Sequence, residues 1–280
     1  MKYKFLISIT VIFCMKAIGE KNFAQSAIPS TSTKEGSNGT IELFNSENLD
    51  GWYTFLKGYG RNKDPKDVFN VEDGLIHISG EEWGGITTVE EYEDYKLVVE
   101  FKWGDKTFEP RKNKARDSGI LIHSQGEDGG SSGTWMHSIE AQIIEGGTGD
   151  FIVVGDGSEK FSVSSSVASE KQANSFIFKP GGEPATINSG RINWFGRDPE
   201  WQDVKGFRGE EDVERAVGGW NKIEIIAIDD NILVFLNGIL VNEAYDVKPS
   251  KGKIQIQSEG AQIFVRRVDL TPLLEKNKRF

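Results

Sequence analysis

The sequence has few of the residues that carry the most familiar cofactor-binding and nucleophilic chemistries. Its 280 residues include one cysteine, three histidines and three methionines. The single cysteine, Cys14, lies in an apolar stretch close to the N-terminus, so the rest of the chain must fold without disulfides. There is no phosphate-binding glycine loop followed by Lys and Ser or Thr, no His-Glu-x-x-His and no Gly-x-Ser-x-Gly elbow. These absences exclude several common types of active site.

Long apolar runs are also missing. The longest, from Phe5 to Met15, has about 11 residues, whereas a membrane-spanning helix needs about 20, so we expect no membrane insertion. Lys2 and Lys4 precede this run and small residues follow it near Ala24. This order is typical of a secretory signal peptide. We therefore predict a signal peptide at residues 1–24 and a periplasmic or secreted protein, without a lipid anchor because Phe13 precedes Cys14 where a lipoprotein signal has a small residue.

The chain is acidic, with a formal net charge of −10 at pH 7. The first 24 residues are positively charged, so the remainder is more acidic still. Such a surface repels polyanions, which argues against nucleic acid and anionic membranes as partners.

Beyond the predicted signal peptide, the pattern of residues predicts one all-β domain. Residues 25–39 are rich in Ser, Thr, Gly and Asn and are expected to form a flexible tether, and residues 40–280 to form a single domain. Short runs of Val, Ile, Phe and Trp alternate with Gly, Asn and Asp, and no window keeps a helical period. The expected strands are Leu75–Ser79, Tyr95–Trp103, Gly119–Ser124, Ser138–Glu145, Ile223–Asp229, Asn231–Leu236, Lys253–Ser258 and Gln262–Leu270.

Tight turns and long loops complete this pattern. Asp229-Asp230-Asn231 and Asn237-Gly238 predict hairpin turns on either side of one strand. Two long stretches, Gly104–Asp117 and Gly146–Gly219, are expected to be irregular and hold most of the Gly and Pro. Loops of that length in a compact domain are usually functional or disordered.

Side chains alternate across a strand, so parity separates two faces. Glu140 and Gln142 oppose an apolar set, and a β-bulge near Ile143-Ile144 would bring Glu145 to join them. By the same rule, Gln255, Gln257 and Glu259 lie together on the face of their strand opposite the apolar residues Ile254 and Ile256. His123 lies on the corresponding face of the strand Gly119–Ser124. If these strands share a sheet, they build a polar concave surface. One polar face is, however, also common in antiparallel sheets without any function.

Aromatic and histidine residues near these positions favour a functional site over a merely solvated sheet face. Half-buried carboxylates and imidazoles beside indoles are costly unless they are used, and Trp135, His137 and His123 lie close to Glu140 in the sequence. Flat rings can also hold the apolar face of a sugar. The candidate platforms near loops or strand ends are Trp52, Tyr59, Trp83, Trp135 and Trp194, whereas Trp103 and Trp220 are as well explained as core residues and His77 as structural.

No motif requires a cofactor, and we expect none. Asp64, Asp67, Asp73, Asp128 and Asp150 could supply oxygen ligands, but their spacing matches no calcium loop. A structural divalent cation therefore stays open, and the identity of any metal is unknown.

A series of short motifs resembles the 3-keto-disaccharide hydrolase family. They occur in the family's order over nearly the whole chain that follows the predicted signal peptide. The motifs are Ile41-Glu-Leu-Phe-Asn, Leu49-Asp-Gly-Trp52, Val71-Glu-Asp-Gly-Leu75, Trp83-Gly-Gly-Ile-Thr-Thr88, Tyr95-Lys-Leu-Val-Val-Glu-Phe101, Asp117-Ser-Gly-Ile-Leu-Ile-His123, Ser138-Ile-Glu-Ala-Gln142, Gly219-Trp-Asn221, Leu236-Asn-Gly238, Ile254-Gln-Ile-Gln-Ser-Glu-Gly260 and Phe264-Val-Arg-Arg-Val268.

The resemblance implies an all-β, two-sheet concanavalin A-like jelly-roll sandwich that acts on a small carbohydrate, a glycoside already oxidised at C3. Two features depart from the family pattern: Asp117, where the family more often has Asn, and a long insertion around Gly155–Gly218. The first affects a local turn or a substrate hydrogen bond, and the second reshapes the cleft.

Chemistry on a 3-keto-glycoside needs a base near C2, donors for the oxygen at C3 and an acid at the leaving oxygen. We expect Glu140 and His123 in the base and acid roles, with the assignment between them open, and Gln142 and Gln257 as neutral donors. Substrate contacts are expected from Glu259, Trp135, Trp83, His137 and Glu145.

Two other functions remain open. Glu140-x-Gln142-x-x-Glu145 echoes the strand of laminarinase-type retaining glucanases, whose two outer carboxylates would lie about 5–5.5 Å apart as nucleophile and acid/base. The chain could also be a carbohydrate-binding module, which would use the same aromatic residues without needing Glu140.

Overall fold

The computed structural model describes residues 34–35 and 39–273, and the predicted signal peptide lies outside them, as does most of the tether. The described residues form strands and turns without an α-helix, which confirms the all-β prediction. Within these ranges there is consequently no helix with the length and apolar character needed to cross a membrane.

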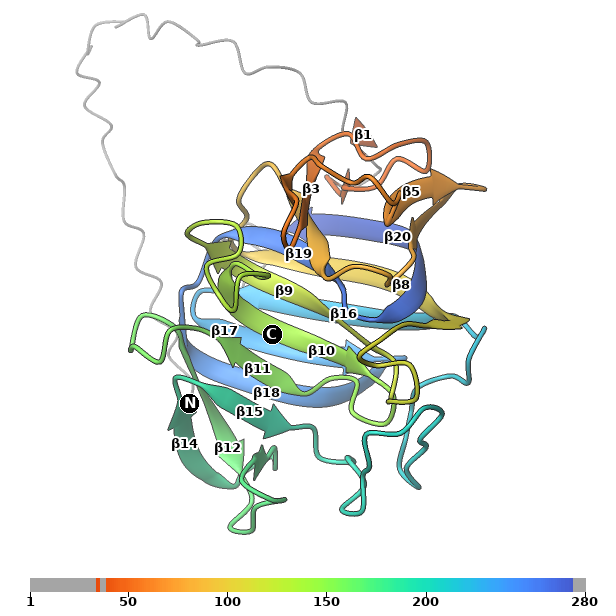
Figure 1. The fold of residues 1–280 in the computed structure, drawn as a ribbon. Helices are drawn as coiled ribbons and strands as arrows, with labels where there is room; N and C mark the ends of the chain where they lie inside the picture. The colour runs from red at the N-terminus through yellow and green to blue at the C-terminus, as the bar shows by residue number, and fades with distance from the viewer. Residues whose placement is uncertain (1–33, 36–38, 274–280) are drawn as a thin grey trace, which may run out of the picture. The chain divides into compact units, whose positions relative to one another are not determined.

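The strands form two sheets packed face to face, which confirms the two-sheet concanavalin A-like sandwich (Figure 1). In the described residues the first, which we call the back sheet, has the order β1 (Lys34–Glu35), β2 (Ile41–Glu42), β20 (Ala261–Pro272), β8 (Tyr95–Thr107), β16 (Asn221–Ile228), β17 (Asn231–Leu236), β18 (Ile239–Lys248), β12 (Ser162–Val167) and β14 (Glu183–Ile187). Two further strands extend it from β20, namely β6 (Leu75–Ile78) and β5 (Phe69–Glu72).

The second sheet carries the functional candidates, and we call it the site sheet. Its order is β13 (Phe176–Ile177), β15 (Gly190–Asn193), β11 (Phe151–Val154), β10 (His137–Ile144), β9 (Asp117–Gln125), β19 (Lys253–Ser258), β7 (Gly84–Thr88), β3 (Trp52–Leu56) and β4 (Gly60–Arg61). All the expected strands are present, with ends that differ by a few residues. The middle of the site sheet is therefore built from β10, β9 and β19, the three strands with long polar side chains.

Alternation places the core between the sheets. The inner face of the site sheet contributes fully buried side chains to one large apolar cluster, among them Ile120, Ile122, Ile139, Ala141, Ile254 and Ile256. The back sheet contributes the facing side chains, which include Trp103 and Phe101. Burial of this apolar area is the main force that holds the layers together. Where the pairing is regular, the sequence neighbours of these inward residues point outward.

The expected hairpins are confirmed, whereas the expected irregular insertion is not. Asp229 and Asn237 have positive φ values of 50° and 52° at the ends of β17, the left-handed conformation that tight hairpin turns require. The stretch 146–219, however, contains β11 to β15. Three of these strands extend the site sheet and two extend the back sheet, so the insertion widens the sandwich instead of only looping over it.

Some of the aromatic candidates are core residues and others lie outside the core. Trp52 and Trp194 belong to the inter-sheet core, as Trp103 does, and so they are not platforms for a ligand. Trp220 is half-buried on the outer side, where the guanidinium of Arg266 lies 4.4 Å from its ring centroid.

Candidate active site

The outer face of the site sheet brings polar side chains into adjacent rows. In the strand register, Glu140 on β10 lies opposite Leu121 on β9 and Ile152 on β11. Two residues further along β10, Gln142 lies opposite Gly119 on β9. All four strands β19, β9, β10 and β11 contribute to this face, so residues from distant parts of the sequence meet there.

Gly119 allows two polar side chains to pack directly over its Cα. A Cβ added at this position would lie 2.1 Å from Oε1 of Glu140 and 2.5 Å from Oε1 of Gln257. No residue other than glycine fits without moving both. Both of these oxygens are buried and neither has a hydrogen-bond partner. Buried acceptors without partners are rare and costly, which marks these two oxygens as candidates to hold a proton or to meet a ligand.

Burial raises the pKa of the Glu140 carboxyl to about 8, and the nearby carboxylates of Asp117 and Asp150 act in the same direction. Arg191 opposes the shift. A carboxyl with this pKa is mostly protonated at neutral pH and can donate a hydrogen bond or a proton.

Two further carboxyls respond to the same surroundings. Burial raises the pKa of Asp117 to about 7, opposed by Arg111 and Arg191. Burial also raises the pKa of Glu259 well above its ordinary value, and Asp117 and Glu140 add to the effect. Three carboxyls with raised pKa values around one position are typical of acid–base chemistry. The sequence analysis expected Asp117 to affect only a local turn or a substrate hydrogen bond. In the structure Asp117 instead forms a carboxyl cluster with Glu140 and Glu259.

A buried ion-pair network borders this cluster. Nη1 of Arg191 on β15 donates to Oδ2 of Asp150 at 2.8 Å, and Nη1 of Arg197 donates to the same oxygen. The backbone N–H of Trp194 donates to the other carboxylate oxygen of Asp150 at 2.8 Å. Asp150 is fully buried, so both oxygens are satisfied and the position of Arg191 is well defined.

Gln142 connects this network to Asp117. Its Nε2 donates to Oδ1 of Asp117 at 2.6 Å and to the carbonyl of Ser118 at 2.9 Å. Its Oε1 accepts from Nη2 of Arg191 at 3.4 Å. Since the amide is fully engaged, Gln142 holds the charged groups in place and has no free donor for a substrate.

An apolar patch covers the other side of Glu140. The indoles of Trp83 and Trp135 stack with their ring centroids 6.2 Å apart. Trp135 forms a small cluster with Leu121 and Val154, and the partly buried Trp83 and Ile152 pack against it. This cluster is separate from the inter-sheet core. Trp135 is buried and Trp83 is partly buried, and an indole pair of this kind beside polar groups is suited to the apolar face of a sugar ring.

His123 does not join the site. The register of β9 against β19 shifts between Lys253 and Gln255, and His123 has a φ of 53°. This irregularity turns the ring toward the core, where it meets Tyr95 edge-on at a centroid distance of 5.9 Å. Its Nδ1 is 2.9 Å from the carbonyl of Pro249. Burial lowers the pKa of His123 to about 4, so the ring is neutral and lies away from Glu140.

His137 and Glu145 also lie apart from the cluster. The ring of His137 packs on Phe161 at 5.2 Å, and Phe161 belongs to the inter-sheet core. The bulge expected near Ile143-Ile144 is absent, because the pairing with β9 shifts only between His137 and Ile139. Glu145 therefore does not turn onto the face of Glu140. It is buried and accepts from Nη1 of Arg116 at 2.6 Å and from the backbone N–H of Gly206 at 2.9 Å.

The predicted site residues therefore fall into two groups in the structure. The structure brings together Glu140, Gln142, Gln257 and Glu259, and places Trp83 and Trp135 beside them. It adds Gly119, Asp117, Arg191 and Asp150. Arg191 was missed because it lies in the stretch expected to be irregular, and Asp150 was noted only as an oxygen ligand. Among the described residues, no group of three or more His, Cys, Asp and Glu side chains is arranged to hold a metal ion.

The raised pKa of Glu140 predicts a pH-dependent stability. A group whose pKa is higher in the folded than in the unfolded state stabilises the fold below its unfolded pKa. That contribution is lost as the pH rises through the folded pKa. For Glu140 the window runs from 4.5 to about 8. We expect Glu140→Gln, which cannot ionise, to become more stable relative to the wild type as the pH rises from 4.5 to 9. Urea unfolding of both proteins at the two pH values measures this difference, and a difference independent of pH would contradict the assignment.

The profile of the family described as "3-keto-alpha-glucoside-1,2-lyase-like domain" matches residues 39–271. No curated protein matches the chain at a significant level.

Several solved structures are similar to the chain at low identity. Two candidate glycosyl hydrolases from Parabacteroides distasonis are among the similar structures. One has 18% identity and a TM-score of 0.48 over 83% of this chain and 93% of that chain. The other has 20% identity and a TM-score of 0.47 over 84% and 100%. A β-glucanase from Bacillus licheniformis is 13% identical, with a TM-score of 0.42 over 85% and 99%.

Proposed function

The chain belongs to the 3-keto-alpha-glucoside-1,2-lyase-like domain family, and we propose that it is a carbohydrate-active enzyme that cleaves the glycosidic bond of 3-keto-glycosides. The observation that carries the proposal is Glu140. Its carboxyl is buried, has a pKa raised to about 8 and carries an unpartnered Oε1 that packs over Gly119. Such a group is suited to moving a proton near neutral pH.

The chemistry follows from the ketone. A carbonyl at C3 makes the hydrogen on C2 acidic, so a base can remove it and form an enolate whose charge lies on the C3 oxygen. The electrons then form the C1–C2 double bond while the C1–O bond breaks, and the leaving oxygen takes up a proton. Water adding across this double bond gives net hydrolysis. The protein must supply proton transfer and a stabiliser for the enolate.

The site offers a group for each of these tasks. Glu140 is the proton-transfer residue that we propose, with Asp117 and Glu259 as neighbouring carboxyls that exchange protons with it. Two cations border the carboxyl cluster. Arg111 forms an ion pair with Asp117 at 3.1 Å, whereas Arg191 is held by the buried Asp150 and lowers the pKa of Glu140, so we assign Arg191 to the developing charge on the C3 oxygen. The stacked pair Trp83 and Trp135 suits the apolar side of the bound sugar.

Retaining glucanase chemistry is disfavoured by the position of Glu145. That mechanism needs two carboxyl groups facing one bond, whereas Glu145 is bound to Arg116 and to the Gly206 N–H. A non-catalytic binding module is disfavoured by the carboxyl cluster. Holding three carboxyls with raised pKa values destabilises the fold at neutral pH, and binding through indoles alone does not require them.

Matched substrates test the proposal directly. We expect the protein to cleave a 3-keto-disaccharide and to leave the same disaccharide, unoxidised, uncleaved under identical conditions. Only the first has an acidic C2 hydrogen. Deuterium at C2 should slow cleavage or be washed out into water during turnover, which mass spectrometry of product and recovered substrate detects. Equal rates on both sugars, with C2 deuterium retained, would overturn the elimination mechanism.

A further inference from the structure

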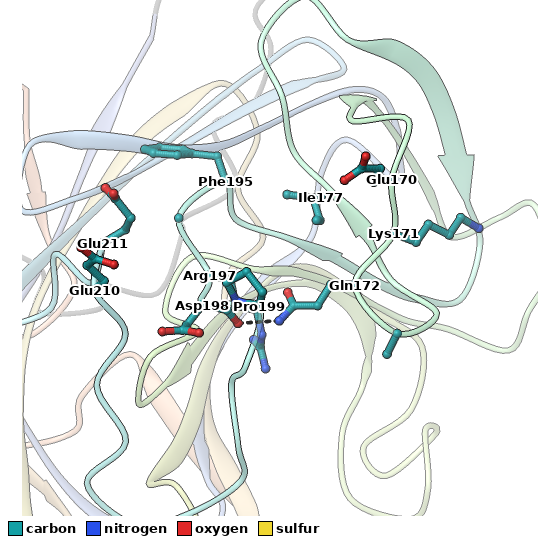
Figure 2. A pocket seen from close by; sticks show the side chains of 12 residues that line it. Glu170, Lys171, Gln172, Ile177, Phe195, Arg197, Asp198, Pro199, Glu210 and Glu211 are labelled. Carbon is teal, nitrogen blue, oxygen red and sulfur yellow. Dashed lines mark hydrogen bonds between the residues drawn. The ribbon is translucent and has the colours of Figure 1, made fainter.

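A cavity of about 530 Å³ lies away from Glu140, and we call it the loop cavity. Its walls come from residues 170–173 and 195–199, with Ile177, Glu210 and Glu211 completing them (Figure 2). A volume of this size is within the range of small-molecule sites. Gln172 ties two walls together, because its Nε2 donates to the carbonyl of Asp198 at 2.5 Å and its Oε1 accepts from Asn193 at 2.8 Å.

Phe195 provides an apolar surface in this cavity. It is a large apolar side chain that is 45% exposed, and its ring meets Trp194 edge-on at 5.3 Å. Trp194 is itself buried in the core, and the adjacent Gly196 leaves no space, since a Cβ there would lie 2.3 Å from the Trp194 ring. Trp194 thus fills the core side of this segment, and the Phe195 ring lies on the outside. An exposed aromatic ring at the wall of a cavity is typical of a ligand contact.

The polar lining indicates the charge and the functional groups of the ligand. Figure 2 shows Glu210 and Glu211 on one side of the cavity and Gln172 and Glu170 on the other. The ammonium group of Lys171 lies over the ring of Phe176 at 3.9 Å. Carboxylate and amide oxygens accept hydrogen bonds from hydroxyl groups and repel anions. No metal-binding group occurs among the described residues. A neutral ligand with an apolar face and several hydroxyls fits this lining.

Arg197 connects the loop cavity to the carboxyl cluster. It lines the cavity and donates to the Asp150 carboxylate that also binds Arg191. The guanidinium of Arg197 also lies 4.0 Å from the ring centroid of Trp201. The cavity is thus a separate place on the molecule whose wall shares one buried anion with the site.

We propose that the loop cavity is a second carbohydrate-binding site, which takes a neutral sugar unit against Phe195. The identification of the ligand as a sugar rests on the proposed function, whereas the existence of a binding site rests on the cavity. The sugar could be free or could be the distal unit of a longer substrate, and both sources present the same ring and hydroxyls.

Binding to the full chain tests this proposal without any turnover. D-Glucose and methyl α-D-glucoside are titrated and followed by tryptophan fluorescence, because Trp194 and Trp201 lie beside the cavity. Glucosamine and glucuronate serve as the cationic and anionic counterparts. We expect saturable binding of the neutral sugars, weakened roughly 3- to 10-fold by Phe195→Ala, on the scale of one aromatic contact. The matched control is Ile239→Ala, which truncates a side chain 46% exposed on β18 of the back sheet and should change nothing.

Several results would overturn the proposal: no saturable response to either neutral sugar, equal affinity in Phe195→Ala and wild type, or tighter binding of glucosamine or glucuronate than of glucose. Loss of glucose binding in Glu140→Gln would also overturn it, because the sugar would then occupy the site sheet. A raised KM for a 3-keto-disaccharide in Phe195→Ala identifies the distal unit of the substrate as the occupant, and an unchanged KM identifies free sugar. Phe195-dependent glucose binding without cleavage of 3-keto substrates would mean that only the proposed function fails.

Discussion

Replacing Glu140 by Gln is expected to reduce turnover of a 3-keto-disaccharide by roughly 10²-fold or more, the usual scale for a general acid–base group. The amide keeps the size and the hydrogen-bonding reach of the carboxyl but cannot move a proton. Substrate affinity should change much less, because the stacked indoles Trp83 and Trp135 remain in place. The measurement is kcat and KM of the variant, and the loss should fall on kcat.

A matched control is available in Glu243→Gln. Glu243 is an exposed residue on β18 of the back sheet, so the same chemical change there should leave both constants unaltered. Turnover of Glu140→Gln within a few-fold of the wild type would exclude Glu140 as the proton-transfer group. Asp117 and Glu259 would then be the next carboxyls to replace.

The second large effect is expected from Arg191→Met. This change removes the cation that we assign to the enolate, and loss of one such stabilising donor typically costs roughly 10²–10³-fold in kcat. Asp150 keeps its bonds to Arg197 and to the Trp194 N–H, so the local backbone should hold. Arg191 also lowers the pKa values of Glu140, Asp117 and Glu259.

The pH profile gives this variant a second readout. Without the nearby cation the carboxylate forms become less favourable, so the pKa values rise and the pH dependence of turnover should move toward alkaline pH. Arg266→Met is the control, because Arg266 is an exposed arginine on β20 of the back sheet and should leave rate and profile unchanged. A full rate with an unshifted profile in Arg191→Met would show that the enolate is stabilised elsewhere.

The fold was predictable from the sequence because its signals are local. Alternation of apolar and polar residues in Ser138–Glu145 and Lys253–Ser258 requires only neighbouring positions, and it correctly separated inner from outer side chains. The turn at Asn237-Gly238 likewise depends on the conformational preferences of two residues. For the same reason, the alternation already assigned Glu140, Gln142 and Gln257 to a polar face.

The rest of the candidate site depends on pairing between distant segments. His123 was assigned to the polar face by parity, and parity fails wherever a strand changes register. Glu145 was assigned to that face through a bulge expected near Ile143-Ile144. A register shift occurs between β9 and β19 close to His123, whereas the shift expected beside Glu145 does not occur. Neither event has a clear sequence signal, because a bulge depends on how two strands fit each other.

The sequence alone therefore determined the strands, the inward-facing apolar residues and a polar strand face centred on Glu140, all of which follow from periodicity within a few residues. Only the tertiary structure decided which charges surround that carboxyl. Arg191 reaches the site because β15 pairs with β11 near one end of the sheet order. Gly119 lies under the side chains of Glu140 and Gln257 because β9 lies between β10 and β19. The pKa of Glu140 follows from this burial and from these neighbours, and both are properties of the assembled sandwich.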